Sequence, residues 1–70
     1  MGYYMTIGKR VKAIMACDGK TSVQFEVGKV IYMGQRALVE FEKNICGHDG
    51  NGIGANRKCW MMDPDKLVEV

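Results

Sequence analysis

The sequence predicts an all-β domain, and three observations support that prediction. Short stretches of β-branched and aromatic residues alternate apolar and polar side chains, as half-buried strands do. Glycines separate these stretches from one another. No helix-sized stretch places apolar residues at positions i, i+3, i+4 and i+7. Such short strands must curl into a small barrel or a bent five-stranded sheet to bury one face.

Length and composition limit the chain to one small domain that spans residues 1–70. A chain of 70 residues is too short for two separate cores, which excludes doubly wound dehydrogenases and barrel enzymes. Hydrophobic residues make up 47% of the chain, enough for a compact core. The net charge of +2 does not by itself indicate a nucleic-acid-binding protein.

The N-terminal third predicts a flexible start over residues 1–6, followed by two strands. Residues 8–16 form the first, with Val11, Ala13 and Met15 on one face. Residues 17–22 contain Asp-Gly and predict a turn. Residues 23–27 alternate regularly and predict the next strand.

The middle of the chain predicts a hairpin. Gly28 interrupts the strand pattern, which indicates a bulge or a bend. Residues 29–33 are rich in β-formers, and residues 34–36 form a turn. In the strand 37–42, Ala37, Val39 and Phe41 share one face.

The C-terminal part predicts a long glycine-rich loop over residues 43–58 and then two more strands. Residues 59–62 form the first of these strands. Asp63-Pro64 starts a tight turn or one-turn 3₁₀ helix, because the proline ring fixes φ. Residues 67–70 close the chain as a last short strand.

This order of segments resembles the Src-homology-3-like small barrels, including their translation-factor, Tudor-like and CAP-Gly relatives. The resemblance rests on Gly-Lys-x-Val-Lys near the start, Val-Gly-Lys-Val-Ile-Tyr, Leu-Val-Glu-Phe-Glu, an aromatic strand and a proline-containing turn. It implies a five-stranded barrel with one 3₁₀ turn before the last strand.

The C-terminal half also resembles small proteins encoded by bacteriophages and prophages, over a G-H-D-G-x-G loop followed by a C-W strand. The matching residues are Val39-Glu40-Phe41, Ile45, Gly47-His48-Asp49-Gly50, Gly52, Cys59-Trp60 and Leu67. Small phage proteins often bind and redirect a host protein, so the resemblance implies a phage origin and, by analogy, a host partner.

The glycine-rich loop concentrates the chemistry of the chain. Its glycines permit positive φ, so that backbone N–H groups can converge on an anion, with Arg57 and Lys58 nearby. The alternative is a long connection that needs glycine only to fold back on the sheet. Loops of this length are uncommon in compact domains and are often functional. The candidate partner-binding residues are His48, Asp49, Asn51, Ile53, Arg57, Lys58, Trp60 and Met62.

Metal binding and catalysis have weaker signals. Cys46, His48 and Cys59 are zinc-competent, but their spacing matches no standard zinc motif, so zinc binding stays open. We expect no bound cofactor. His48 is the only histidine, and no third group is evident to orient a Cys–His pair. We therefore expect no catalytic residue and no enzymatic activity, with His48 pinning the loop to itself.

Trp60 has two interpretations. It is either the main core filler or part of a ligand groove with Tyr32, Tyr3 or Tyr4. Met61 and Met62 add adaptable contact surface, and either would extend a binding patch if it faced outward beside Ile53.

The cysteine count and the N-terminus predict a cytoplasmic protein, in the host cell if the gene belongs to a phage. Three cysteines are an odd number and favour free thiols in a reducing compartment. The N-terminus lacks the pattern of a signal peptide, and no apolar run approaches the ~20 residues that span a bilayer.

Together these features predict a non-catalytic binding module that modulates or inhibits a host protein, such as a defence nuclease or a polymerase. One alternative is a nucleic-acid-binding barrel with a basic stripe. That stripe would consist of Lys9, Arg10, Lys12, Lys20, Lys29, Arg36, Arg57 and Lys58. Another alternative is a binder of a small anion in the loop. No membrane partner is expected, and exposed strand edges leave a homodimer open.

Overall fold

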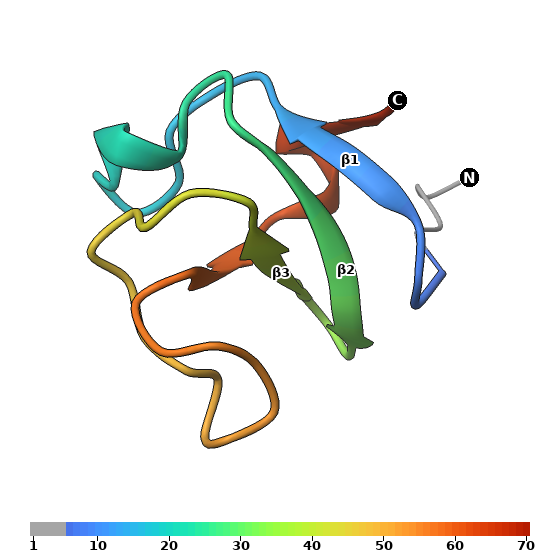
Figure 1. Ribbon diagram of the computed structural model, residues 1–70. Coiled ribbons are helices and arrows are strands. Elements are labelled where there is room, and N and C mark those ends of the chain that lie inside the picture. Colours follow the sequence, from blue (N-terminus) through green and yellow to red (C-terminus); the bar gives the residue numbers. More distant parts are fainter. Residues whose placement is uncertain (1–5) are drawn as a thin grey trace.

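The structure is a computed structural model and describes residues 6–70, which form one antiparallel sheet (Figure 1). Its strands are β1 (Arg10–Ala13), β2 (Val27–Met33), β3 (Ala37–Phe41), β4 (Cys59–Met62) and β5 (Leu67–Glu69), in the order β4-β3-β2-β1-β5. Two 3₁₀ turns, η1 (Thr21–Val23) and η2 (Pro64–Lys66), complete the secondary structure of these residues. The prediction of an all-β fold is confirmed. Pairing between the edge strands β4 and β5 is absent within residues 6–70, so this sheet is open.

One face of the sheet carries the core. The register places Val30 opposite Val39, and Ala37 opposite Met62, so that these side chains point to the same side. The buried cluster is Val11, Ala13, Cys17, Val23, Val30, Ala37, Val39, Phe41, Ile45, Met62 and Leu67. The predicted common face of Ala37, Val39 and Phe41 is therefore confirmed, as is the 3₁₀ turn before the last strand.

The first strand is shorter than predicted. β1 ends at Ala13. The amide of Ile14 still donates to the carbonyl of Lys66 beside β5, but Ile14 and Met15 form a bend. Met15, which the alternation assigned to the core face, is consequently exposed. The flexible start predicted for residues 1–6 lies outside the described residues, except for Thr6.

The strand predicted over residues 23–27 is wrong. Thr21–Val23 form a 3₁₀ turn, and the N–H of Glu26 donates to the carbonyl of Val23. Phe25 has φ of +65° and is 63% exposed. Its N–H donates to the carbonyl of Ala13, whose own N–H donates to the carbonyl of Glu26, so two residues stand opposite one of β1, as in a bulge. Successive local turn hydrogen bonds override the period-two pattern here, and strand geometry begins only at Val27.

Gly28 lies within a continuous strand, and the irregularity of β2 occurs three residues later. A Cβ atom at Gly28 would stand 2.6 Å from the carbonyl oxygen of Glu40 and 2.9 Å from the Cα of Phe41. Glycine is therefore required by close approach of β3. The register shifts between Val30 and Tyr32, which makes Ile31 the bulged residue.

Candidate functional site

A groove of about 610 Å³ lies where the long loop meets the sheet face opposite the core. In Figure 1 this loop is the yellow-to-orange segment that projects beyond β3. The residues that line the groove are Tyr32, Leu38, His48, Asp49, Gly50, Asn51, Ile53 and Met61.

The sheet contributes a row of three apolar side chains to the groove. Tyr32 on β2 pairs with Leu38 on β3, which in turn pairs with Met61 on β4. Without the bulge, strict alternation would put Tyr32 on the core side with Val30. The bulge at Ile31 turns the ring of Tyr32 to the other face, where it is 50% exposed.

The loop above this row is held by hydrogen bonds to its own residues and to β3. Nδ1 of His48 accepts the N–H of Gly50 at 2.9 Å, so a neutral imidazole carries its proton on Nε2. The carbonyl of Asp49 accepts the N–H of Gly54 at 2.9 Å. A carboxylate oxygen of Glu40 accepts the N–H of Ala55 at 2.8 Å. The loop is thereby pre-organised, and the interpretation of His48 as a pin agrees with this geometry.

The loop also covers the outer face of β3 and β4. Leu38 and Cys59 are buried beneath it, although neither belongs to the main core cluster. A Cβ atom at Gly50, whose φ is +62°, would lie 2.5 Å from Cδ2 of Leu38. A Cβ atom at Gly54 would lie 2.5 Å from Sγ of Cys59. These two glycines are needed where the loop rests on the strand side chains.

The backbone amides of the loop are largely committed. Nine amides of residues 43–58 already donate within the protein, namely those of Ile45, Cys46, Gly47, His48, Gly50, Ile53, Gly54, Ala55 and Lys58. An anion-binding concavity needs several convergent N–H groups without other partners. This arrangement does not favour the small-anion alternative.

Trp60 lies at the border of the core, next to the edge of the sheet. It pairs with Val39 and packs against the core, and its indole N–H donates to the carbonyl of Cys17 at 3.1 Å. The rings of His48 and Trp60 have centres 5.4 Å apart, and Nζ of Lys20 lies 5.1 Å from the Trp60 ring centre. Trp60 is therefore a half-buried residue packed against the core, and Phe41 is the largest fully buried side chain.

A groove shared by Trp60 and Tyr32 is not formed. Trp60 follows the core face through Val39, whereas Tyr32 follows the opposite face through Leu38. The alternative partners Tyr3 and Tyr4 lie outside the described residues.

The candidate partner-binding residues divide between several places. His48, Asp49, Asn51 and Ile53 line the groove together. Lys58 lines a separate hollow, and Arg57 is exposed at a position with φ of +69°.

Of the two methionines of β4, Met61 faces the groove. Met62 is fully buried, because β4 alternates and places it with Ala37 in the core. It therefore offers no surface to a partner. Met61, Leu38 and Gly50 line the groove but are not among the predicted partner-binding residues, although Met61 was expected to extend the patch if it faced outward beside Ile53. Alternation around Trp60 would have assigned Met61 to the outer face, but nothing in the sequence marks Gly50 as resting on Leu38.

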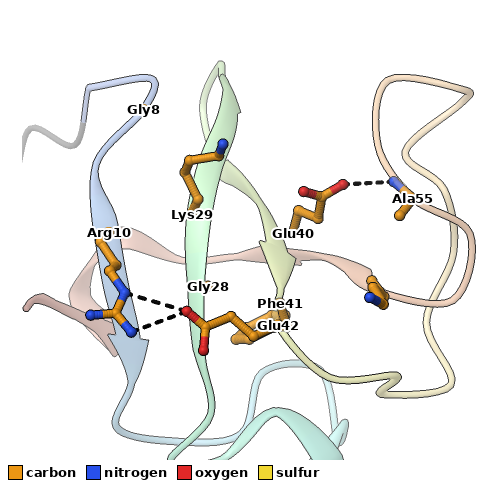
Figure 2. Close-up of a pocket in the computed structure, with 9 residues that line it drawn as sticks. Gly8, Arg10, Gly28, Lys29, Glu40, Phe41, Glu42 and Ala55 are labelled. Atoms are coloured by element: carbon orange, nitrogen blue, oxygen red, sulfur yellow. Dashed lines mark hydrogen bonds and ion pairs between the residues drawn. The ribbon is translucent and has the colours of Figure 1, made fainter.

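The separate hollow has a volume of about 440 Å³ and lies over β1, β2 and β3 (Figure 2). The guanidinium of Arg10 donates to Glu42 at 3.1 and 3.3 Å. Lys29 on β2 pairs with Arg10 on β1 and with Glu40 on β3. Charges of both signs therefore alternate across the hollow.

The basic residues of the predicted stripe are mixed with acidic ones. Lys9 pairs with Glu69, and Arg10 with Glu42. The guanidinium of Arg36 bonds Asp18 and Asp63, both at 2.9 Å. Interleaved charges of this kind weaken the continuous positive field that a nucleic acid would need.

Arg36 also ties three segments together behind the groove. Its guanidinium donates to Sγ of Cys17 at 2.9 Å as well as to Asp18 and Asp63. These bonds, first to Asp18 and then to Asp63, raise the pKa of Arg36 above its ordinary value. Asp63 also accepts a hydrogen bond from Lys66, and this contact lowers the pKa of Asp63.

The zinc-competent residues do not converge. Among residues 6–70, no three His, Cys, Asp or Glu side chains are arranged to hold a metal ion. Cys46 is exposed, while Cys59 is buried and donates from Sγ to the carbonyl of Ala55 at 3.4 Å. Burial, followed by the charges of Glu40 and Asp49, raises the pKa of Cys59.

Within the same residues, no helix has the length and apolar character needed to cross a membrane. Comparison of the chain with protein-family models, with curated proteins and with solved structures finds no match.

Proposed function

We propose that the chain is a non-catalytic module that binds another protein through the groove between its long loop and the sheet. The observation that carries the proposal is the groove itself. It combines an apolar floor with polar groups on a loop that is already hydrogen-bonded into shape. A pre-organised surface of this kind loses little conformational entropy on binding.

The exposed apolar residues of the groove support a protein partner. Tyr32 is 50% exposed and Ile53 is 55% exposed, and both line the groove together with the buried residue Leu38. Solvent-exposed apolar groups that cluster in a hollow with a polar rim are typical of protein contact sites.

The absence of catalysis is part of the proposal. Nδ1 of His48 is already engaged by Gly50, so a base at this position would have to give up that bond. The buried thiols of Cys17 and Cys59 are not accessible nucleophiles.

The fold, origin and partner follow the resemblances noted in the sequence. The strand order β4-β3-β2-β1-β5, with η2 before β5, supports a Src-homology-3-like arrangement. We further propose a phage or prophage origin, a location in the host cytoplasm, and a host protein as the partner. A homodimer through the edge strands β4 or β5 is a further proposal, which light scattering after size-exclusion chromatography tests.

Affinity capture from a lysate of the natural host tests the function. The baits are wild type, Ile53→Ser in the groove and, as matched control, Ile7→Ser, another isoleucine in a turn and 63% exposed. We expect one host protein to be retained by wild type and by Ile7→Ser and lost from Ile53→Ser. Equal retention by all three baits would contradict the groove. Capture that is removed by nuclease or moderate salt would favour nucleic-acid binding instead.

A further inference from the structure

We infer that the groove recognises a basic segment of its partner, in which a lysine or arginine lies beside aliphatic or aromatic side chains. This inference rests on the proposed function and names the chemistry of the ligand. The carboxylate of Asp49 lines the groove and has no ion-pair or hydrogen-bond partner within residues 6–70.

Asp49 differs from the other carboxylates of the chain. Of the eight Asp and Glu residues, five form ion pairs, and Glu40 accepts a backbone N–H. Those five are Asp18, Glu26, Glu42, Asp63 and Glu69. Asp49 and Asp65 alone have carboxylates that form no ion pair with, and accept no hydrogen bond from, any group within residues 6–70. Asp65 is exposed on η2, whereas Asp49 is half-buried and lines the groove.

The surroundings of Asp49 leave its charge uncompensated. Of the residues that the structure describes, no lysine or arginine lines the groove. Asp49 and Glu40 both lie near the thiol of Cys59, but Glu40 lines the separate hollow, where it accepts the N–H of Ala55. A half-buried carboxylate in such a site gains more from an incoming cation than a fully exposed one would.

The apolar lining fits the rest of a basic side chain and its neighbours. Lysine and arginine carry aliphatic stems that pack on apolar surface while their charged ends reach a carboxylate. The exposed ring of Tyr32 can also attract a cation over its face. An aliphatic neighbour in the ligand would cover Ile53 and Met61.

The net charge of the whole molecule makes the inference sharply testable. At +2, the chain as a whole repels a basic peptide. A preference for basic ligands would therefore have to come from the groove.

Selection from a displayed library of random peptides tests the inference. The baits are wild type, Asp49→Asn, Asp49→Lys, Ile53→Ser and the control Asp65→Lys. Asp65→Lys changes the net charge as much as Asp49→Lys does, at the other carboxylate without a partner. We expect wild type and Asp65→Lys to enrich peptides with Lys or Arg next to apolar residues. Asp49→Lys should reverse this preference toward Asp and Glu, and Ile53→Ser should enrich little.

Binding of the best synthetic peptide then gives the magnitude. We expect Asp49→Asn to lower the affinity for this peptide about tenfold, as expected for loss of a partly desolvated charge pair. Groove-dependent enrichment of neutral or acidic peptides would overturn the inference and leave the proposed function in place. Enrichment unaffected by Ile53→Ser, or no enrichment by any bait, would overturn both.

Discussion

Gly28 and Gly34 both have φ outside the left-handed region, but the space around their Cα atoms differs. A Cβ atom at Gly28 would collide with the backbone of β3, at Glu40 and Phe41. A Cβ atom at Gly34 would meet only the ring edge of Tyr32, at an ordinary 3.5 Å. The sequence marks both as interruptions of a strand pattern, but only the paired backbone distinguishes them.

Alanine substitutions at these two glycines should have opposite effects. Gly28→Ala must push β2 away from β3 and should lower the free energy of unfolding by about 1–3 kcal/mol. Gly34→Ala should leave it unchanged or raise it by about 0.4–1 kcal/mol, by restricting the unfolded chain. Urea denaturation of both variants measures the difference. Equal destabilisation would show that β3 does not approach β2 this closely.

Asp63 should make stability depend on acid pH. Its contacts with Lys66 and Arg36 lower the pKa of this carboxyl below its unfolded value of 3.8. The unfolded chain therefore binds a proton more readily, so the stabilisation is present above about pH 4 and is lost as the pH falls below it.

The comparison with Asp63→Asn isolates this effect. At about pH 6 wild type should be more stable than Asp63→Asn, and at about pH 3 the difference should narrow. The control Asp65→Asn removes a neighbouring carboxylate that makes no hydrogen bond within residues 6–70. A wild-type advantage over Asp63→Asn that is the same at both pH values would contradict the role of Asp63.

At the scale of elements, the long loop is a built structure with its own turns. The loop contains two matching side-chain turns, in which Asn44 accepts the N–H of Cys46 at 2.8 Å and His48 accepts the N–H of Gly50 at 2.9 Å. Asparagine makes this two-residue turn commonly, whereas histidine uses Nδ1 for it here. The sequence indicated a functional loop but gave no geometry for it.

Replacing His48 tests the pin directly. In His48→Ala the amide of Gly50 should lose its acceptor and exchange with solvent at least about tenfold faster, which NMR hydrogen exchange measures. The amide of Ala55, held by Glu40, should change little. His48→Asn should restore protection of Gly50, because it can form the turn seen at Asn44. Unchanged exchange in His48→Ala would mean that the bond does not hold the loop.

The strands divide into those that the sequence predicts and those that it does not. β3, β4 and β5 have clear alternation or sharp boundaries at Gly34, Asp63 and Pro64, and their predicted positions agree with the structure. Residues 23–27 alternate just as clearly, yet Phe25 takes a positive φ and breaks the strand. Local turn hydrogen bonds decided that segment, and a period-two pattern contains no information about them.

At the scale of the whole molecule, the sheet and the loop bury two of the three cysteines. Cys17 lies in the main core and Cys59 lies under the loop, while Cys46 is exposed. A reagent that reacts with thiolates should therefore modify Cys46 first. Cys59 should react last or nearly so, because its raised pKa lowers the thiolate fraction as well.

Thiol titration of the native and denatured protein checks this order. We expect one fast thiol in the native protein, three in denaturant, and loss of the fast phase in Cys46→Ser. Protection of Cys46 that a chelator removes would instead favour zinc held by Cys46, His48 and Cys59. More than one fast native thiol would contradict the burial of Cys17 or Cys59.

The global fold class was easier to predict from sequence than the site. Composition and alternation fix an all-β sheet with a long loop, because both follow from local chain properties. The groove depends on the register shift at Ile31, which brings Tyr32 beside Leu38 and Met61. Contacts between residues far apart in the sequence create that surface, and the single sequence carries no signal of them.

The burial of Leu38 and Cys59 on the far side of the sheet has an evolutionary consequence. A homologue with a tight hairpin in place of the long loop between β3 and β4 would expose the apolar side chains of Leu38 and Cys59 to water. Homologues with a short connection should therefore carry polar residues at the positions of Leu38 and Cys59. Deletion of the loop without these replacements should yield a protein that aggregates.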